Sequence, residues 1–316
     1  MTYARRCASK IDYLYPMNNL PYVVSGGAGF VGQALVRVLR DAGHRVYVLS
    51  TQAVAGREDT IFWDTEKGAI DPAFRCGACK VINLAGAGVA DARWTKARKA
   101  LIRDSRVNSL NTLRLAHERA QITITQLVSA SAIGFYGNAL GLQTETSPGD
   151  ASFLSTTCQD WEKAALQFED AFGIPVSIAR IGIVMHPSGG ALKALTQTFS
   201  LHVAGLPGSG RQIYSWIHRD DLVQLLVWLS AEEHRGIYNA VAPEPVALGT
   251  LMQAAVKASG QWMITVPAPA FAIRLLLGEM AIEVLKSTEV SSAKIQGQGF
   301  QFTYPTIDSA MRHLFS

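Results

Sequence analysis

A glycine-rich turn stands near the start of the chain, between an apolar run at 22–24 and an amphipathic segment. The first glycine of such a turn permits a tight strand-to-helix connection, the second lets the backbone approach a pyrophosphate, and the third lets helix and strand pack closely. Free N–H groups and the positive end of the helix then face the phosphate charge. The turn therefore predicts a dinucleotide site made of Gly26, Gly27, Ala28, Gly29, Phe30, Val31 and Gly32.

The segments that flank the turn agree with a nucleotide-binding unit. Apolar residues between 31 and 42 share one helical face, Gly43 stands where a helix end favours a left-handed residue, and apolar residues resume over 44–50. The sequence thus predicts strand, glycine turn, helix and strand within about 30 residues, as a dinucleotide fingerprint requires. A glycine turn that serves packing alone is the alternative.

Candidate strands alternate with helices along the chain. This alternation predicts an α/β fold with a doubly wound parallel sheet, Rossmann-like and NAD(P)-binding, whose ligands lie at the carboxyl ends of the strands. We expect this domain over 21–242 and a small C-terminal domain over 243–316, with 187–220 contributing to a smaller substrate lobe. The candidate strands fall at 22–26, 45–50, 60–63, 80–85, 125–130, 176–181 and 237–241.

Composition and charge narrow the classes of function. The 316 residues are 48% hydrophobic, enough to bury a large core. No apolar stretch approaches the roughly 18 residues of a membrane span. The net charge of +4 comes from basic residues spread along the chain, which suits an anionic small ligand better than nucleic acid. The seven histidines show no metal-ligand spacing, so we expect no metal, no membrane and no nucleic-acid partner.

The four cysteines and the missing signal peptide indicate a cytoplasmic protein. Cys76 and Cys79 have the CxxC spacing of redox or zinc sites, but neither a second pair nor a nearby histidine completes a site, so an incidental loop pair is expected. Residues 1–20 carry three basic residues and no apolar signal core. We interpret them as an added tail, either from a mis-assigned start or as a weak organelle-targeting segment.

Several motifs together resemble one family. Residues 83–86 read Asn-Leu-Ala-Gly and residues 129–137 read Ser-Ala-Ser-Ala-Ile-Gly-Phe-Tyr-Gly, and further matching stretches stand at 93–95, 105–106, 161–162, 180–184, 208–212, 216–221 and 299–305. Over 21–316 the chain resembles the extended short-chain dehydrogenase/reductases, and more narrowly the atypical branch called epimerase-family proteins, some of them named nucleoside-diphosphate-sugar epimerases. The resemblance implies a nicotinamide cofactor that contacts Leu84, Ala85, Gly86 and Ile183.

Catalysis in that superfamily uses a tyrosine, a lysine four residues later and a serine, and the lysine lowers the pKa of the tyrosine. None of the nine tyrosines here has a lysine four positions on, and the two positions fall on Leu154 and Cys158, which cannot do that work. The resemblance still implies Ser131 as an oxyanion donor, Tyr136 as a proton donor at the cleft and Asn108 as the holder of a proton-relay water. Structural roles are the alternatives for all three, and Cys158 is expected in the core.

The end of the second strand bears on cofactor choice. NAD-specific folds place an acidic residue there, whereas residues 49–52 read Leu-Ser-Thr-Gln. Ser50 and Thr51 can donate hydrogen bonds to a 2′-phosphate, and Arg57 is near enough in sequence to reach it, so we expect NADP(H), with NAD(H) disfavoured. The branch usually carries arginine at the position of Thr51, which reduces the expected affinity. A polar turn after a strand is the alternative.

The substrate side is expected to include Trp94, Arg211, Trp216 and His218. Arg211 can clamp a diphosphate or carboxylate, and Trp216 can stack on a ring. The alternative places Trp216 in the core and lets the acidic pair at 220–221 cap the following helix. Helix capping or domain packing equally explains Trp94.

These residues predict a cytoplasmic, NADP(H)-binding oxidoreductase or epimerase that acts on a small carbonyl or nucleotide-sugar substrate. The alternative is a non-catalytic regulator or scaffold that senses NADPH. The missing tyrosine–lysine pair favours the regulator, and the retained serine and substrate lobe favour the enzyme. The sequence leaves the substrate and the oligomeric state open.

Overall fold

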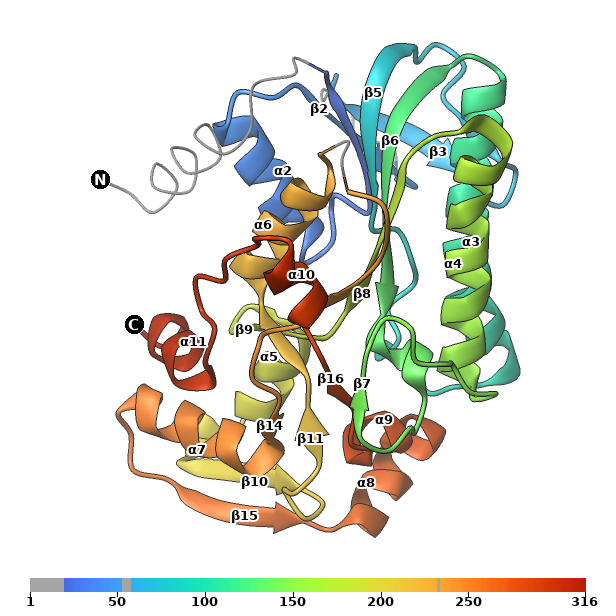
Figure 1. Ribbon diagram of the computed structural model, residues 1–316. Helices are drawn as coiled ribbons and strands as arrows, with labels where there is room; N and C mark the ends of the chain where they lie inside the picture. Colours follow the sequence, from blue (N-terminus) through green and yellow to red (C-terminus); the bar gives the residue numbers. More distant parts are fainter. Residues whose placement is uncertain (1–19, 53–57, 232–233) are drawn as a thin grey trace.

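A mostly parallel sheet organises the nucleotide-binding part of the chain (Figure 1). The computed structural model describes residues 20–52, 58–231 and 234–316. Within them the sheet has eight strands in the order β13-β8-β6-β5-β1-β2-β3-β4, and only β4 runs antiparallel to its neighbour. The strands are β1 (Tyr22–Ser25), β2 (Val46–Ser50), β3 (Thr60–Asp64), β4 (Ala69–Ile70), β5 (Cys76–Asn83), β6 (Ile122–Ala132), β8 (Val176–Ile181) and β13 (Gly236–Ala240).

Helices cover both faces of this sheet because the strands are apolar on both sides. On one face α2 (Gly32–Asp41) and α6 (Arg219–Leu229) pack in one core cluster, which includes Leu35, Leu39 and Leu226. On the other face α3 (Lys96–Glu118) and α4 (Phe153–Phe172) pack in a second cluster with Leu113 and Phe168. Figure 1 shows the two helix pairs on opposite sides of the strands. The predicted doubly wound α/β fold is confirmed.

The order of strands reverses beside β1, which has β2 on one side and β5 on the other. Gly26 follows β1 with a φ of 69°, and an added Cβ would lie 2.7 Å from the Leu84 carbonyl oxygen, so only glycine turns the chain here. A side chain at Gly32, the first residue of α2, would collide with the Gly26 carbonyl. The turn therefore sets α2 directly against the carboxyl end of β1, at a topological switch point.

A smaller lobe forms below the sheet in the view of Figure 1. Its core cluster includes Met185, Trp216, Leu251 and Met311. The lobe is built from β9 (Ile183–His186), α5 (Gly190–Thr196), η2 (Phe199–Leu201), β10 (Val203–Pro207), β11 (Ile213–Tyr214), β12 (Trp216–His218), β14 (Val246–Ala247), α7 (Leu248–Ser259), β15 (Ile264–Ala268), α8 (Ala270–Leu277), η3 (Gly278–Met280), α9 (Ala281–Leu285) and α11 (Ile307–Leu314).

The chain returns from the lobe to the sheet before it ends. Strand β16 (Glu289–Val290) pairs with β7 (Leu142–Gln143), which follows the 3-10 turn η1 (Ile133–Tyr136), and α10 (Ala293–Gly297) packs against β13. Phe300 then joins the core cluster of α2 and α6. Residues 289–300 thus belong physically to the nucleotide-binding part, so the predicted division at 243 does not separate two independent packing units.

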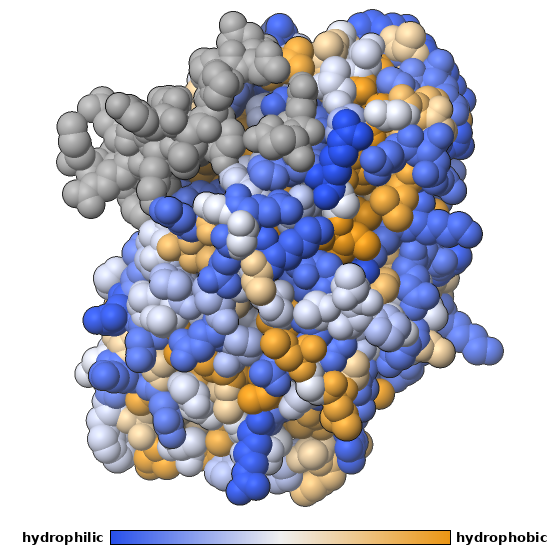
Figure 2. Space-filling model, viewed as in Figure 1, coloured by the Kyte–Doolittle hydropathy of each residue, from blue (hydrophilic) through white to orange (hydrophobic). Residues whose placement is uncertain are grey.

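The expectation that Cys76 and Cys79 lie in a loop is wrong. Strand β5 begins at Cys76, earlier than predicted, so Cys76 and Cys79 lie buried on a strand with register irregularities and not in a loop. No helix among the described residues is long and apolar enough to cross a membrane. In Figure 2 the visible face mixes hydrophilic residues with separate hydrophobic groups.

The close packing at Gly32 gives a stability prediction. Gly32→Ala should lower the free energy of unfolding by about 1–3 kcal/mol, because the new methyl group forces α2 away from β1. Gly77→Ala is the matched control, since nothing lies within 4 Å of a Cβ at that position. Urea unfolding followed by circular dichroism measures both. Equal stabilities would show that the helix does not depend on this contact.

Candidate functional site

Two adjacent cavities open at the carboxyl ends of β1, β2 and β5. The first, of about 300 Å³, brings together six residues predicted at the cofactor, namely Gly26, Ala28, Ser50, Thr51, Ala85 and Gly86, with Leu49, Trp63, Thr65, Ala87 and Ser105. The second, of about 550 Å³, is lined by Gly27, Ala28, Gln33, Val36, Arg37, Arg40, Asp41, Val48, Ser50 and Thr60. Ala28 and Ser50 border both cavities, so they form one groove across the glycine turn.

The turn leaves room for an extended ligand. A Cβ at Gly29 would approach only the Gly26 carbonyl oxygen, at 3.1 Å, so the backbone there faces open space. Gln33 holds the turn by donating to the Ala28 carbonyl at 2.7 Å. The Gln52 N–H donates to the Ser50 hydroxyl, which in turn donates to the Gln52 carbonyl, so the end of β2 forms a local turn. Arg57 lies outside the described residues.

Sequence reasoning missed two arginines of the groove. Arg37 and Arg40 stand four and seven residues after Gln33 on α2, and all three line the larger cavity. Arg40 is paired with Asp59, and Arg37 is exposed. The sequence did carry a signal for them, because Gln33, Arg37 and Arg40 stand at i, i+4 and i+7 and therefore share one face of the helix that follows the glycine turn.

Phe30 lies under the segment that leads into the lobe. Its ring centroid is 6.0 Å from that of His186, and the Arg219 guanidinium lies 5.7 Å from the ring centre. A Cβ at Gly189 would come within 2.6 Å of the ring. Val31 and Leu84 are partly buried against the sheet core, and Ile183 stands at the start of β9. These predicted cofactor residues therefore also connect the turn to the sheet core and to the segment that leads into the lobe.

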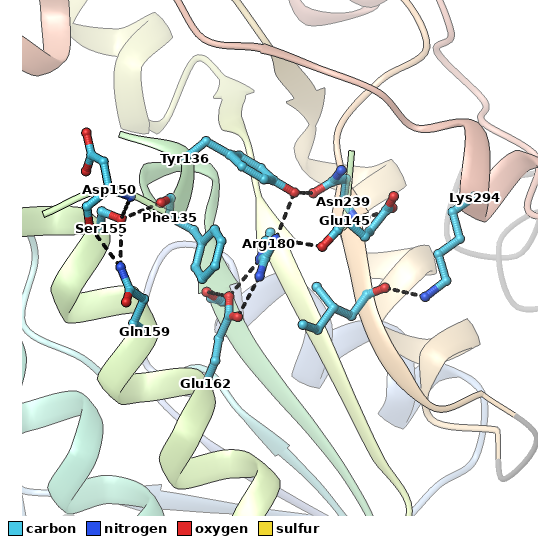
Figure 3. Close-up of polar contacts among 12 residues, drawn as sticks. Phe135, Tyr136, Glu145, Asp150, Ser155, Gln159, Glu162, Arg180, Asn239 and Lys294 are labelled. Carbon is cyan, nitrogen blue, oxygen red and sulfur yellow. Dashed lines mark hydrogen bonds and ion pairs between the residues drawn. The ribbon is translucent and has the colours of Figure 1, made fainter. Parts of the chain in front are cut away.

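A buried ion pair lies beside Ser131, the residue that matches the catalytic serine of the superfamily (Figure 3). Arg180 on β8 binds both carboxylate oxygens of Glu162 on α4, each at 2.8 Å, and the side chains are 2% and 5% exposed. The Ser131 hydroxyl donates to Glu162 Oε1 at 2.6 Å. Because its only proton goes to this carboxylate, Ser131 is not a free donor to a substrate oxygen. This arrangement contradicts the expected oxyanion role.

Tyr136 belongs to the same network, contrary to the expectation that its phenol faces the cleft. The side chain is fully buried, its hydroxyl donates to Asn239 Oδ1 at 2.5 Å, and Arg180 donates to it at 3.0 Å. Burial raises the pKa of Tyr136, although the Arg180 hydrogen bond opposes that shift. Arg180 also lies 3.4 Å above the Phe135 ring and donates to the Glu145 carbonyl at 3.2 Å. The phenol thus belongs to a buried network in which both Asn239 and Arg180 bind its oxygen.

The two positions of the missing catalytic pair are apolar or neutral. A Cβ at Gly134 would lie 3.3 Å from Leu154 and 3.9 Å from the Cys158 sulfur, so both residues pack against η1. Burial, together with the nearby Glu162 charge, raises the pKa of Cys158 to about 11. Cys158 is therefore a thiol in the core near neutral pH, as expected. Asn108 is half-buried on α3, which runs unbroken, so it does not distort that helix.

Arg106 is a partly buried cation beside the cofactor groove that sequence reasoning gave no role. Its guanidinium donates to the Ala87 and Ile102 carbonyls, at 3.0 and 2.6 Å, and lies 5.0 Å from the Trp161 ring centre. Burial lowers its pKa, which the nearby Cys158 partly offsets. Within the described part of the chain no carboxylate forms an ion pair with it. Gly86 lies against this side chain, so the cation borders the groove.

Two predicted substrate residues are core residues. Trp216 is fully buried on β12, and its indole N–H donates to the Glu244 carbonyl at 2.8 Å. His218 is fully buried as well, and its Nδ1 accepts the Asp220 N–H, so His218 itself caps α6. Both expectations are wrong because the lobe closes over β12. Arg211 is exposed, and Trp94 is half-buried with its ring centroid 5.0 Å from that of Phe153.

His218, Asp220 and His313 place their possible ligand atoms within 4.8 Å of one another. Because His218 Nδ1 accepts the Asp220 N–H, the ring proton resides on Nε2, which lies 3.2 Å from His313 Nδ1. A metal ion needs that nitrogen without its proton. The group is accordingly a hydrogen-bonded chain, in which the Tyr304 ring lies tilted against His218, with 4.1 Å between ring centroids, and stacks on His313 at 4.6 Å.

Comparison with known proteins agrees with this geometry. The model of the NAD dependent epimerase/dehydratase family matches residues 22–240, and a domain of unknown function, DUF1731, matches residues 268–314. The chain belongs to the NAD dependent epimerase/dehydratase family. It is 34% identical over 302 residues to the epimerase family protein SDR39U1 homolog, chloroplastic, of Arabidopsis thaliana, which covers 92% of this chain and 85% of that protein.

Solved structures of this family share the fold. The human epimerase family protein SDR39U1 (isoform 2), solved with NADPH, matches with a TM-score of 0.85 and 27% identity over 94% of this chain and 99% of that chain. A nucleoside-diphosphate sugar epimerase from Corynebacterium glutamicum matches with a TM-score of 0.74 and 29% identity, covering 99% of this chain and 61% of that one. The resemblance seen in the sequence motifs is therefore confirmed.

The buried histidine predicts acid sensitivity. Burial lowers the pKa of His218 to about 3, from an ordinary value near 6.5. Between these two values His218 is protonated in the unfolded chain and neutral in the folded chain. The free energy of unfolding therefore falls as the pH drops from about 6.5 toward 3. In His218→Asn, where asparagine can still cap α6, the loss between pH 7 and pH 5 should be smaller by about 2 kcal/mol. Urea unfolding at both pH values tests this, and equal losses in the two proteins would contradict it.

Proposed function

We propose that this protein binds NADPH in the groove at the carboxyl ends of β1, β2 and β5. The observation that carries the proposal is the open backbone at Gly29 beside cavities lined by Ser50 and Arg37. The end of β2 carries hydroxyl groups and no carboxylate, which favours a 2′-phosphate, and the one carboxylate among the described residues that line the larger cavity is Asp41, at the end of α2. The human relative solved with NADPH supports the same choice.

The groove residues fit such a cofactor from end to end. The N–H groups of the glycine turn suit a pyrophosphate, and Arg37 suits the 2′-phosphate. Arg106 supplies a positive charge beside Gly86, at the edge of the groove. When bound, the cofactor supplies hydride chemistry. The chain's own residues must orient the substrate and supply the proton.

We further propose oxidoreductase chemistry on a small carbonyl substrate without the usual tyrosine, lysine and serine. Leu154 and Cys158 replace the first two, and Ser131 is committed to Glu162. The proton must therefore come from another group at the carboxyl ends of β6 and β8. An epimerase acting on nucleotide-sugars is the alternative substrate class.

A regulator that binds NADPH without turnover is the second candidate. The buried Arg180–Glu162 pair favours it, because Glu162 binds Ser131, the one member of the tyrosine, lysine and serine set that the chain retains. Such a protein would change a partner's activity according to the NADPH level. The enzyme and the regulator share the cofactor site and differ only in turnover.

The cofactor choice can be tested by fluorescence titration with NADPH and NADH. NADPH should bind more tightly, and Ser50→Asp or Arg37→Glu should weaken NADPH binding about tenfold or more while changing NADH binding little, since each change places a negative charge near the 2′-phosphate. Lys163→Glu, an equal charge reversal on the exposed face of α4, is the control. Gly29→Val serves as the non-binding reference. Tighter binding of NADH by the wild type would overturn the proposal.

Turnover separates the enzyme from the regulator. NADPH oxidation is screened against carbonyl compounds and nucleotide-sugars, and any activity is repeated with Ser131→Ala. Because the Ser131 hydroxyl donates its hydrogen bond to Glu162 and not to a substrate, this variant should keep kcat within about threefold. Its free energy of unfolding should fall by about 1–2 kcal/mol, because the buried hydrogen bond is lost. Ser129→Ala, which removes another buried hydroxyl from β6, is the control. Tight NADPH binding with no turnover, and a partner protein recovered only with NADPH, would support the regulator.

A further inference from the structure

A small cavity separates the nucleotide-binding sheet from the lobe. It measures about 70 Å³ and is lined on the sheet side by Gly134 and Ile183, and on the lobe side by Tyr214, Glu283 and Lys286. Gly134 follows β6, and Ile183 follows β8, so the cavity lies at the carboxyl ends of these two strands. This is the end of a parallel sheet where ligands bind.

The cavity borders the positions of the missing catalytic pair. Gly134 lines it and also packs on Leu154 and Cys158, which stand where the superfamily has its tyrosine and lysine. Neither of these side chains can exchange a proton near neutral pH. Any proton donor for the proposed reaction must therefore come from the opposite wall of the cavity, which the lobe provides.

That wall carries one cation and its partner. Lys286 Nζ lies 2.8 Å from Glu283 Oε2, and the side chains are 10% and 26% exposed. The Tyr214 hydroxyl donates to the Val284 carbonyl at 2.8 Å, and burial raises the pKa of Tyr214 to about 12. The Tyr214 hydroxyl proton is thus used in a hydrogen bond to the backbone and is not available to a substrate. An ammonium group has three N–H donors, so Lys286 retains donors beyond its bond to Glu283.

We propose that this cavity binds the carbonyl oxygen and a neighbouring hydroxyl of a small neutral hydroxycarbonyl compound, and that Lys286 donates the proton. The inference rests on the proposed NADPH-dependent oxidoreductase function. The substrate carbonyl oxygen accepts a hydrogen bond from Lys286, and the hydroxyl donates to Glu283. Carbonyl carbon accepts a hydride from NADPH, the C=O π bond breaks, and the oxygen takes the proton of Lys286. The products are an alcohol and NADP⁺, and the lysine amine regains its proton from water.

Size and charge decide the substrate class. One water-sized group needs about 10–15 Å³, so 70 Å³ holds on the order of five such groups, whereas a nucleoside-diphosphate sugar is far larger. The lysine charge is balanced by Glu283, so an anionic group would meet a neutral pair and a nearby carboxylate. Lys286 as a hydrogen-bond donor and Glu283 as an acceptor lie side by side, so they match a compound that offers both an oxygen acceptor and a hydroxyl donor.

Binding is tested first on the cofactor-free full chain by saturation-transfer NMR. The probes are hydroxyacetone, pyruvate, which is similar in size but anionic, and UDP-glucose. Wild type should give signals with hydroxyacetone and at least fivefold weaker signals with the other two. Lys286→Met should lose the hydroxyacetone signals at least fivefold. Lys67→Met, which removes an exposed lysine paired with an aspartate three residues earlier, should keep them.

Turnover then separates proton donation from simple binding. Lys286→Gln keeps a hydrogen-bond donor but cannot give up a proton in this step, so it should retain hydroxyacetone binding and lower kcat for its reduction about 100-fold or more. NADPH affinity, measured by fluorescence titration, should be unchanged. If Lys286→Met fails to fold, Glu283→Ala, which removes the acceptor of the substrate hydroxyl, should lose the hydroxyacetone signals at least fivefold in its place.

Equal hydroxyacetone signals in wild type and Lys286→Met would overturn the proposal, as would preferred binding of pyruvate or UDP-glucose. An unchanged kcat in Lys286→Gln would overturn the proton-donor role. Failure to bind NADPH would instead refute the proposed function itself, and the cofactor-free NMR result distinguishes the two failures.

Discussion

The Arg180–Glu162 ion pair holds together the elements around the candidate active site. Arg180 comes from β8, Glu162 from α4, Ser131 from β6 and Tyr136 from η1, and every one of these side chains is almost fully buried. Removing either Arg180 or Glu162 would leave the other charge buried and unpaired, which typically costs about 3–5 kcal/mol. The geometry at the carboxyl ends of β6 and β8 therefore depends on a pair that contributes no reactive group of its own.

This pair also takes up the polar groups that the sequence offers for the superfamily's usual chemistry. Ser131, which would polarise a carbonyl, donates its hydrogen bond to Glu162. The Tyr136 hydroxyl is held between Arg180 and Asn239. Cys158 lies in the same core, where burial keeps it protonated. Polar residues that look catalytic in sequence thus belong to a buried structural network, and the proton donor that we propose, Lys286, comes from the lobe instead.

The sequence predicted the local features well and the long-range ones poorly. The glycine turn, the order of strands and helices, and the groove residues from Gly26 to Gly86 follow from short-range spacing, because a strand-turn-helix unit encodes its own geometry. The roles of Ser131 and Trp216 depended on partners far along the chain, Glu162 and Glu244. His218 looked like a cleft residue because its burial by Tyr304 and His313 arises only when the C-terminal helix folds back. Arg37 was recoverable from helical spacing, whereas nothing local marked Lys286.

The small cavity owes its shape to anchors on both sides of α9. Before it, Arg93 donates to the Leu276 carbonyl at 2.9 Å, and Lys99 pairs with Glu279 at 2.5 Å. After it, the Thr288 N–H donates to the Ile213 carbonyl at 3.0 Å, and the Thr288 carbonyl accepts the Ser215 hydroxyl at 2.9 Å. The partly exposed Lys99–Glu279 pair contributes little, since ion pairs at the surface are worth about 0–1 kcal/mol. The Arg93 and Thr288 bonds, which fix backbone groups, therefore set where Lys286 and Glu283 stand. A donor held in this way approaches the cavity in one orientation, which reduces the entropy lost when a substrate is positioned.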